Sequence, residues 1–514
     1  MDYRIEVVPR QGCDGQAVDL LSQMVQLEIT RPRHVQVSAL FFVRGTLSSA
    51  DVERLATKLL VDPIVETYRW RPLDAPPPPD DPNLVIEVGF RPGVTDPVAA
   101  HTLRRAQLLR IGAVDAIATG HRYAFEGELT AGDLHRTAQE ILCNDVIQTY
   151  TLGPLQPAFM PRADSSDQVE IVPIRDADDD ALAQLSVERV LFLSSAEMRA
   201  IRDRFRELQR DPTDVELETL AQTWSEHCQH KTFKANVTYT QTGGLARVNA
   251  GETGIVDGPE RVSGLLRTYL RAATERLARP WVRSAFVDNA GIIDFDETME
   301  VSFKVETHNH PSALEPFGGA NTGAGGVIRD ILGVSAKPIA CTDILCFGPA
   351  DMPKEQLPAG ALHPRRIARG VIAGIEDYGN KMGIPTVSGA ILYDPDYAAN
   401  PLVFCGCVGL APKDTHRRDP QPGDLCVALG GRTGRDGLHG ATFSSAELTH
   451  ETSHTVGTVV QIGDPITEKA VTDAVLIARD EGLYTAITDC GAGGFSSAVG
   501  EMGSKVGVEV DLQD

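Results

Sequence analysis

The pattern of apolar and polar positions near the N-terminus occurs twice. Residues 58–68, KLLVDPIVETY, reappear in altered form 82 positions later, as EILCNDVIQTY at 140–150. Nearly the same spacing relates IEVVPR at 5–10 to IEVGFR at 86–91. Self-similarity at a fixed offset indicates an internal duplication, so the two segments should share one fold.

Each copy combines two periods of hydrophobicity. Segments in which apolar and polar residues alternate predict strands, and segments with apolar residues three or four positions apart predict helices. In both copies the order is strand, helix, strand, helix, strand. We therefore predict two small α+β units, 1–72 and 83–154, joined by a stiff, proline-rich segment at 74–80. Neither unit gathers titratable residues as a catalytic site would, so we interpret both as docking modules.

A polar segment follows the second unit, and helical periodicity follows that segment. Residues 155–185 are rich in aspartate and predict a linker. The spacing of apolar residues over 195–209 predicts a helix. Thr213, with Glu216 three residues later, matches a capping box at the start of another helix, which carries the sequence WSEHC.

From about residue 285 onwards, strand-like runs alternate with helical and glycine-rich ones. The runs MEVSFKVE, PLVFCGCVGL and DLCVALGG have the alternation or the continuous apolarity of strands. Strands interleaved with helices predict an α/β or α+β class for this half of the chain.

Composition and charge narrow the classes of function. The 514 residues include 48 basic and 71 acidic side chains, a formal net charge of −23, and 42% are apolar. Binding to nucleic acid or to an anionic membrane requires a basic face, so we expect neither partner. We find no apolar signal segment, no run long enough to span a membrane and no CxxC pair among nine cysteines. We therefore expect a cytoplasmic protein with about three or four domains.

The segment that carries most chemistry is KVETHNHP, which begins at Lys304. It continues a predicted strand, in which side chains alternate between two faces, so Lys304, Glu306 and His308 should share one face. Burial of such a face is costly unless it binds something charged. Lysine suits a phosphate, glutamate a hard cation and histidine a proton. The alternative is an exposed polar strand face without a ligand.

A glycine-rich stretch at 316–330 ends in Arg329 and Asp330. We predict a loop that runs into the start of a helix, where backbone N–H groups could hold a phosphate. Arg329 offers a forked donor to phosphate, and Asp330 offers a second ligand to a hard cation. The stretch lacks the GK[ST] of a P-loop, so that type of nucleotide site is not supported. A simple turn is the alternative.

Further candidate residues lie in three other segments. His227 and His230 are three positions apart and should be neighbours on one helix face. A structural or solvated pair is the alternative, and no third ligand nearby supports zinc. Asp489, at a strand end before GAGG, is a candidate third metal carboxylate. A second glycine-rich loop is predicted at 430–440.

Six motifs occur in the order seen in the phosphoribosylformylglycinamidine synthase family, which this chain resembles over about 210–514. They are WSEHC, KxETHNHP, GGANTGAGGVIRD, GGRTGRDGLHGA, QxGDP and DxGAGG. The two N-terminal units resemble the small accessory subunit of that enzyme, fused in tandem. The resemblance implies an ATP-dependent ligase of purine biosynthesis. In that reaction ATP phosphorylates the amide oxygen of formylglycinamide ribonucleotide, and ammonia from a separate glutaminase displaces phosphate to give the amidine.

The resemblance also implies roles for individual residues. His227 and His308 are implied as catalytic, with His308 as the proton acceptor. Lys304 and His230 are implied as ATP contacts, although His230 stands where many small-type members have tyrosine. Mg²⁺ is implied as the cofactor. The implied metal ligands are Glu306, Asp330 and Asp489, and the implied substrate contacts are Thr307, His308, Asn309, His310, Arg329 and Gln461.

The implied fold is a multidomain α+β and α/β arrangement. A linker with a helix at 155–212 precedes an N-terminal domain like that of aminoimidazole ribonucleotide synthetase at 213–421. The start of an α/β C-terminal domain follows at 422–514, and we expect that domain to be incomplete. Family synthetases pair two similar halves, so we expect a complementary C-terminal half as a partner and a chain that is inactive alone.

Two other functions remain open from the sequence. One is a related ATP-dependent synthetase of the same superfamily. The other is a non-catalytic half that docks a glutaminase within a split enzyme.

Overall fold

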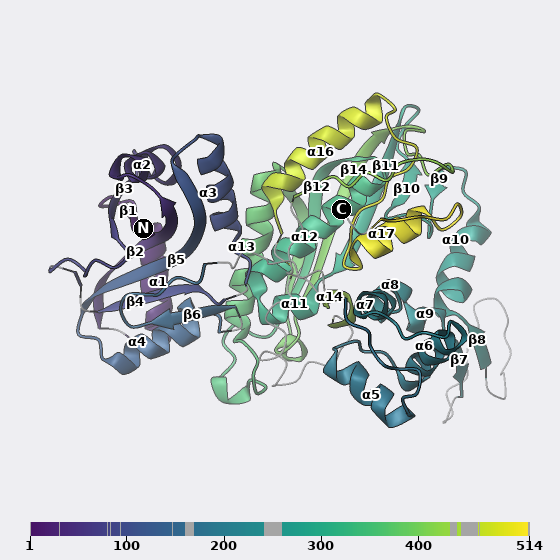
Figure 1. The fold of residues 1–514 in the computed structure, drawn as a ribbon, viewed down its shortest axis with the longest axis horizontal. Helices are drawn as coiled ribbons and strands as arrows, with labels where there is room; N and C mark the ends of the chain where they lie inside the picture. The colour runs from purple at the N-terminus through teal and green to yellow at the C-terminus, as the bar shows by residue number, and fades with distance from the viewer. Residues whose placement is uncertain are drawn as a thin grey trace.

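The computed structural model (Figure 1) covers most of the chain. The residues that it describes are 2–29, 31–79, 81–82, 84–92, 94–145, 147–159, 169–240, 260–431, 439–443, 461 and 463–511.

The two N-terminal units have the predicted order of elements. Serine or threonine caps the second helix of each unit, and Ser48 with Asp51 and Thr130 with Asp133 form capping boxes at equivalent positions. The first unit consists of β1 (Asp2–Pro9), α1 (Gly15–Gln26), β2 (Pro32–Thr46), α2 (Ser49–Leu55) and β3 (Glu66–Pro72). The second consists of β4 (Val85–Phe90), α3 (Pro97–Leu108), β5 (Ala113–Gly127), α4 (Ala131–Thr137) and β6 (Gln148–Thr151).

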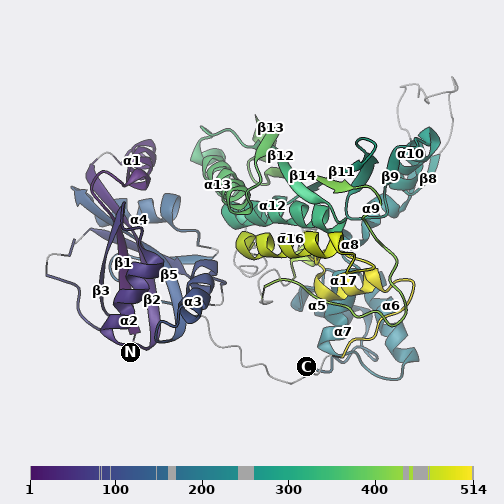
Figure 2. The same ribbon diagram turned by 90° about the horizontal axis from the view of Figure 1, so that it is seen from above.

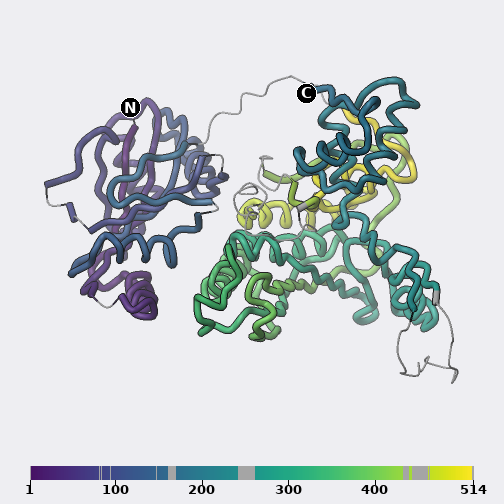
Figure 3. Tube along the Cα trace, turned by 90° about the horizontal axis from the view of Figure 1, so that it is seen from below, coloured from purple at the N-terminus to yellow at the C-terminus, as the bar shows by residue number. Residues whose placement is uncertain are grey.

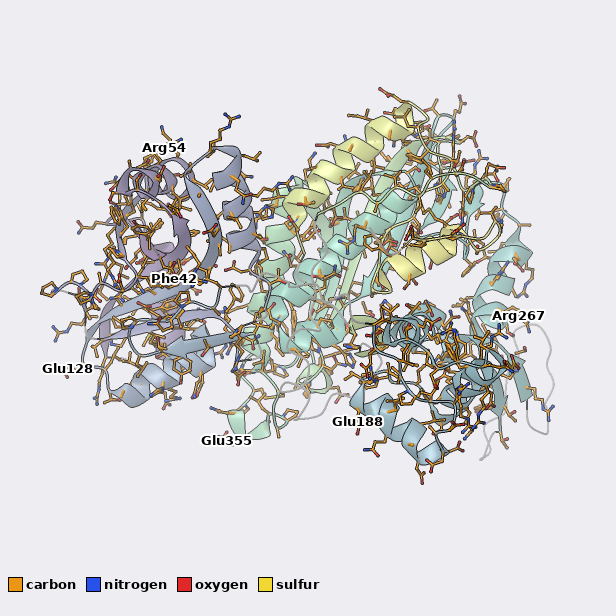
Figure 4. The ribbon with its side chains drawn as sticks, in the orientation of Figure 1. Phe42, Arg54, Glu128, Glu188, Arg267 and Glu355 are labelled. Carbon is orange, nitrogen blue, oxygen red and sulfur yellow. The ribbon has the colours of Figure 1, made fainter. Side chains whose placement is uncertain are left out.

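The two units join in one six-stranded sheet of order β3-β1-β2-β5-β4-β6. The long strands β2 and β5 pair antiparallel at its centre. The three strands of the second unit follow in the reverse of the order of their equivalents in the first unit. Two hydrophobic cores form beneath the helices, one around Met24 and Phe125 and the other around Ile5 and Leu55. Figure 4 shows Phe42 within this part of the molecule and Arg54 and Glu128 at its periphery. The predicted duplication therefore builds a pseudo-symmetric pair.

Four charged side chains lie buried in this sheet, and we call them the charge lattice: Arg4, Glu6, Glu87 and Arg122. Arg4 donates two hydrogen bonds to Glu87, of 2.6 and 2.8 Å, and Arg122 donates a third, of 2.6 Å. Burial raises the pKa of Glu87, but Arg4, the Leu155 amide and Arg122 outweigh it and bring the pKa below its usual value. Each buried charge in the lattice thus faces an opposite charge.

A helical subdomain follows, formed by α5 (Asp179–Glu188), α6 (Ser195–Glu207) and α7 (Asp214–Thr223). Its three helices share one core, which includes Leu182, Ile201 and Leu217. The capping box predicted at Thr213 is present. That core continues across residues 212 and 213, where the sequence predicts a boundary between linker and synthetase domain. Figure 3 shows α17 (Gly494–Met502) beside this subdomain, where it contacts α7.

A second six-stranded sheet occupies the middle of the chain, in the order β13-β12-β14-β11-β10-β9. All its neighbours pair antiparallel except β12 and β13, which are parallel. The strands are β9 (Val282–Ser284), β10 (Gly291–Asp294), β11 (Met299–Thr307), β12 (Lys337–Phe347), β13 (Thr386–Tyr393) and β14 (Leu402–Pro412).

Helices cover one face of this sheet. Figure 2 shows α12 (Pro316–Gly333) and α13 (Pro364–Met382) against the sheet, with α16 (Pro465–Asp480) packed on their far side. The remaining described α-helices and strands are short: α8 (Glu226–Gln229), α9 (Lys231–Lys234), β7 (Asn236–Tyr239), β8 (Glu260–Ser263), α10 (Ala272–Leu277), α11 (Asn309–Leu314) and α14 (Gly440–Phe443).

The other face of the sheet exposes apolar side chains, and we call it the outer sheet face: Phe303, Val305, Ile344 and Leu392. Their exposed fractions run from 36 to 55%, and no described helix lies over them. Exposed apolar area of this kind is typical of a surface that binds another protein.

The strand predicted for DLCVALGG does not form. Residues 424–431 adopt no regular secondary structure, and Leu425 is 90% exposed. Apolar alternation alone does not make a strand, because a strand also needs backbone pairing, which no described segment supplies here.

Candidate functional site

Strand β11 supplies the first part of the site. Lys304 Nζ lies 3.1 Å from Asp330 Oδ2 on α12 and 3.5 Å from Glu306 Oε2. Phe303 and Val305, which alternate with them, belong to the outer sheet face. The predicted alternation is confirmed for Lys304 and Glu306, which share the face opposite Phe303 and Val305; their side chains are 26% and 44% exposed.

Three carboxylates meet here, and we call them the carboxylate cluster: Glu306, Asp330 and Asp489. Asn289 Nδ2 joins two of them, donating to Asp330 Oδ1 at 3.1 Å and to Asp489 Oδ1 at 2.5 Å. Asp489 comes from a segment about 160 residues beyond α12 in the chain, so only the fold brings it to the cluster. Asn289 was not anticipated from the sequence, because nothing in its own segment marks it.

The carboxylates of the cluster carry like charges close together, and this shifts the pKa values of the groups around them. Burial, reinforced by the charge of Asp489, raises the pKa of Asp330 to about 7. Burial also raises the pKa of Asp489. For Lys304, burial lowers the pKa, but Asp330 and Glu306 outweigh that effect and raise it overall. The cluster therefore favours a positive charge beside it.

Oxygen ligands of this kind suit a hard cation such as Mg²⁺. Among the residues that the structure describes, no three His, Cys, Asp or Glu side chains form a ready-made metal cage. Lys304 and the Asn289 amide instead occupy the space between the carboxylates. The donor chemistry thus fits a divalent ion, which would have to displace these hydrogen-bond donors.

His308 lies just beyond β11, at the start of α11. Burial lowers its pKa to about 4, although a hydrogen bond with the Gly319 backbone and the charge of Glu306 oppose the shift, so the ring is neutral near pH 7. Its Nδ1 is buried and has no hydrogen-bond partner among the described atoms. Gly323 of α12 makes room for it, because a Cβ there would lie 2.9 Å from His308 Cβ. The ring is therefore in the unprotonated form that a proton acceptor needs, and one of its nitrogens is free.

His227 of WSEHC and His230, two residues beyond that motif, do not share a helix face as predicted. His227 lies on the four-residue helix α8, whereas His230 has a left-handed φ of 50° and separates α8 from α9. The turn breaks the helical spacing on which the prediction depended. Burial lowers the pKa of His227, while the charge of Glu306 opposes that shift, which places His227 near the cluster.

The glycine-rich stretch is not a loop but most of helix α12, so that prediction is wrong. Its backbone N–H groups bond within the helix and cannot cradle a phosphate, except at the N-terminal turn. The glycines serve close packing instead. A Cβ at Gly319 would lie 2.5 Å from Ser312 N, and one at Gly325 would lie 2.4 Å from Tyr378 Oη.

The remaining predicted substrate contacts gather around the end of β11 and along α12. Thr307 is exposed at the end of the strand, and Asn309 Oδ1 accepts a hydrogen bond of 2.8 Å from Val403 N. His310 follows on α11. The carbonyl of Gln461 accepts a 2.6 Å hydrogen bond from Thr322 Oγ1 on α12.

Arg329, the last of these contacts, donates from Nη1 to Glu468 Oε2 at 2.9 Å. Most of the glycine-rich segment predicted at 430–440 lies outside the described residues.

Comparison with known proteins identifies three domains. Residues 182–231 match the formylglycinamide ribonucleotide amidotransferase linker domain. Residues 287–411 match the N-terminal domain of AIR synthase related proteins, and residues 421–514 match the corresponding C-terminal domain.

Curated relatives agree with these matches. Phosphoribosylformylglycinamidine synthase subunit PurL of Thermoplasma acidophilum is 40% identical over 347 residues, which are 67% of this chain and 41% of the relative. The Moorella thermoacetica subunit is 38% identical over 309 residues, 59% of this chain and 36% of the relative. This chain therefore spans about two fifths of the length of the relatives that it matches.

Among solved structures, Thermotoga maritima PurL complexed with FGAR is 34% identical. The match has a TM-score of 0.44 and covers 60% of this chain and 42% of that one. In the described part of the chain, no helix combines the length and apolarity needed to cross a membrane.

The domain matches and the curated relatives agree. Residues 182–514 contain a formylglycinamide ribonucleotide amidotransferase linker followed by the N- and C-terminal domains of AIR synthase related proteins, in homology with PurL subunits.

Proposed function

We propose that this chain is the synthetase part of a phosphoribosylformylglycinamidine synthase. It would use ATP to convert formylglycinamide ribonucleotide and ammonia into formylglycinamidine ribonucleotide, ADP and phosphate. The observation that carries the proposal is the meeting of Lys304, the carboxylate cluster and a neutral His308 at one end of β11. The identity to PurL subunits supports the choice of reaction.

Each of these residues would have a role in the reaction that suits its side chain. Lys304, beside the carboxylates, would contact the phosphates of ATP, and His230 would lie at the edge of the same site. Glu306, Asp330 and Asp489 would hold Mg²⁺, which when bound offsets the negative charge of the transferred phosphoryl group. His308, which is unprotonated at neutral pH and has a free ring nitrogen, would accept a proton from the attacking ammonia.

The other residues would position the reactants. His227, whose pKa is affected by the charge of Glu306, would assist in catalysis. Thr307, Asn309, His310, Arg329 and Gln461 would bind formylglycinamide ribonucleotide. Correct placement of reacting groups supplies much of the rate in phosphoryl transfer.

Two macromolecular partners belong to the proposal. A glutaminase would supply ammonia, and the tandem N-terminal units, as accessory-subunit-like modules, would dock it. A complementary synthetase half would cover the outer sheet face, whose exposed apolar residues support such a contact. We expect little turnover from this chain without that cover.

The test is an assay of ADP and amidine formation with ATP, Mg²⁺, formylglycinamide ribonucleotide and ammonium chloride. We expect little product from the chain alone and substrate-dependent product when a polypeptide with the complementary half is added. Product formation should require all three small molecules. ATP hydrolysis that does not depend on the ribonucleotide, or amidine formation without ATP, would contradict the proposed reaction.

A further inference from the structure

The Glu468 carboxylate of α16 lies where that helix packs against α12 and α13. Glu468 is only 6% exposed, and its Oε2 accepts hydrogen bonds from Arg329 Nη1 of α12 and from the Tyr378 hydroxyl of α13. Burial of a carboxylate is tolerated when it is paired and hydrogen-bonded, and Glu468 meets both conditions through Oε2, whereas its Oε1 is buried without a hydrogen-bond partner among the described atoms.

Tyr378 is held tightly where it meets Glu468. It is fully buried, and two glycines leave the space that its ring fills. A Cβ at Gly325 would come within 2.4 Å of its hydroxyl, and a Cβ at Gly463 would come within 2.7 Å of its ring. The side chain therefore has no room to turn, so the hydroxyl fixes the position of the Glu468 carboxylate.

The bond to Glu468 uses only one edge of the Arg329 guanidinium. Arg329 Nε is buried and has no hydrogen-bond partner among the described atoms. A guanidinium binds anions best through two parallel N–H groups, and the edge formed by Nε and Nη2 remains available for that purpose. Arg329 thus has one edge anchored and one edge free.

We propose that Glu468 is a positioning residue, which with Tyr378 orients Arg329 so that its free edge faces an anionic group of the substrate. This inference rests on the proposed function, in which Arg329 contacts formylglycinamide ribonucleotide. Glu468 itself touches no substrate. Its effect on binding must therefore pass entirely through Arg329.

A double-mutant cycle on the full chain tests this dependence. Formylglycinamide ribonucleotide is titrated calorimetrically into the wild type, Glu468→Gln, Arg329→Gln and the double variant. We expect Glu468→Gln to weaken binding roughly tenfold or more, as for loss of a charged hydrogen bond, and to have no further effect once Arg329 is replaced. Tyr378→Phe should weaken binding less, and Asp473→Asn, an exposed site on the same helix, should leave it unchanged.

A merely structural role gives a different result. Glu468→Gln would then weaken binding by the same factor with and without Arg329, and that outcome, or wild-type binding by Glu468→Gln, overturns the proposal.

If the wild-type chain does not bind the ribonucleotide, the proposed function fails, and a second measurement still decides the role of Glu468. The rate at which phenylglyoxal modifies Arg329 is followed by mass spectrometry of its peptide. We expect faster modification in Glu468→Gln than in the wild type or in Asp473→Asn. Equal rates in all three would refute the anchoring of Arg329 by Glu468.

Discussion

Two groups of buried charges in this molecule differ in their balance. In the charge lattice of the N-terminal sheet, Glu87 meets Arg4 and Arg122, and its pKa falls below the usual value despite burial. In the carboxylate cluster, Asp330 meets Asp489, and its pKa rises to about 7. Glu87 and Asp330 are both buried, but only the lattice neutralises its charges. Unbalanced charge is costly in a fold that binds nothing, so it marks the cluster as the place for a ligand.

The largest expected effect concerns chemistry in the unbalanced region. His308→Ala should lower the rate of amidine formation in the reconstituted enzyme by about 10²–10⁴-fold, because a positioned base is lost. Nucleotide binding should persist, since His308 is not proposed to contact ATP. Steady-state rates and a nucleotide titration measure the two properties separately. A variant with full activity would remove His308 from the mechanism.

In the charge lattice, substitution of a charged residue should instead lower the stability of the fold. Glu87→Gln leaves Arg4 and Arg122 buried without their shared counter-charge, and it should cost about 3–5 kcal/mol of unfolding free energy in the N-terminal units. Hydrogen exchange of the β1 and β4 amides localises the loss to this sheet. Glu126→Gln, at an exposed position of β5, is the matched control and should change little. Equal protection in both variants would mean that the lattice contributes no stability.

A smaller effect of opposite sign is expected in the cluster. The pKa of Asp330 is higher in the folded chain than in the unfolded one, so the folded state binds more protons between about pH 4 and pH 7. The ionised Asp330 therefore costs stability that is absent below pH 4 and fully present above pH 7. Asp330→Asn should remove this cost and, at pH 8 without Mg²⁺, stabilise the synthetase domain by roughly 1–2 kcal/mol.

Urea unfolding at pH 5 and pH 8 measures the difference. Asp377→Asn, a partly exposed site of α13, serves as the control. A gain that is the same at both pH values would show that ionisation of Asp330 is not its source.

The smallest effect concerns the edge of the lattice. Arg69 donates to Glu6 at 2.8 Å, but its side chain is 45% exposed, so water already screens the pair. Arg69→Gln should cost roughly 0.2–1 kcal/mol, and the cost should shrink further in high salt. Urea unfolding at low and high ionic strength checks both. A cost near that of Glu87→Gln would show that burial does not set the value of these pairs.

Sequence reasoning succeeded where the signal is local. The period of two in β11 placed Lys304 and Glu306 on one face, and the spacing of Thr213 and Glu216 marked the start of α7. Both patterns arise from the geometry of a few consecutive residues. The repeat at an offset of 82 residues likewise predicted two units with the same order of elements.

Sequence reasoning failed where distant segments meet. The glycines of α12 suit a loop as well as a tightly packed helix, and only the positions of Ser312 and Tyr378 decide between the two. Asn289 and Glu468 were missed because their partners lie 41 or more residues away in the chain. Neither has a neighbour in sequence that reveals its role.

Charged side chains on one face of β11 and apolar side chains on the other limit how the sequence of this strand can vary. Substitutions at single positions leave the frame of the strand intact, whereas the loss or gain of one codon within 299–307 shifts each later residue to the opposite side. Such a change would turn Val305 toward the carboxylates and Lys304 toward the apolar surface. We therefore expect variants of this segment to tolerate some single substitutions. Insertion or deletion of an odd number of residues should not be tolerated.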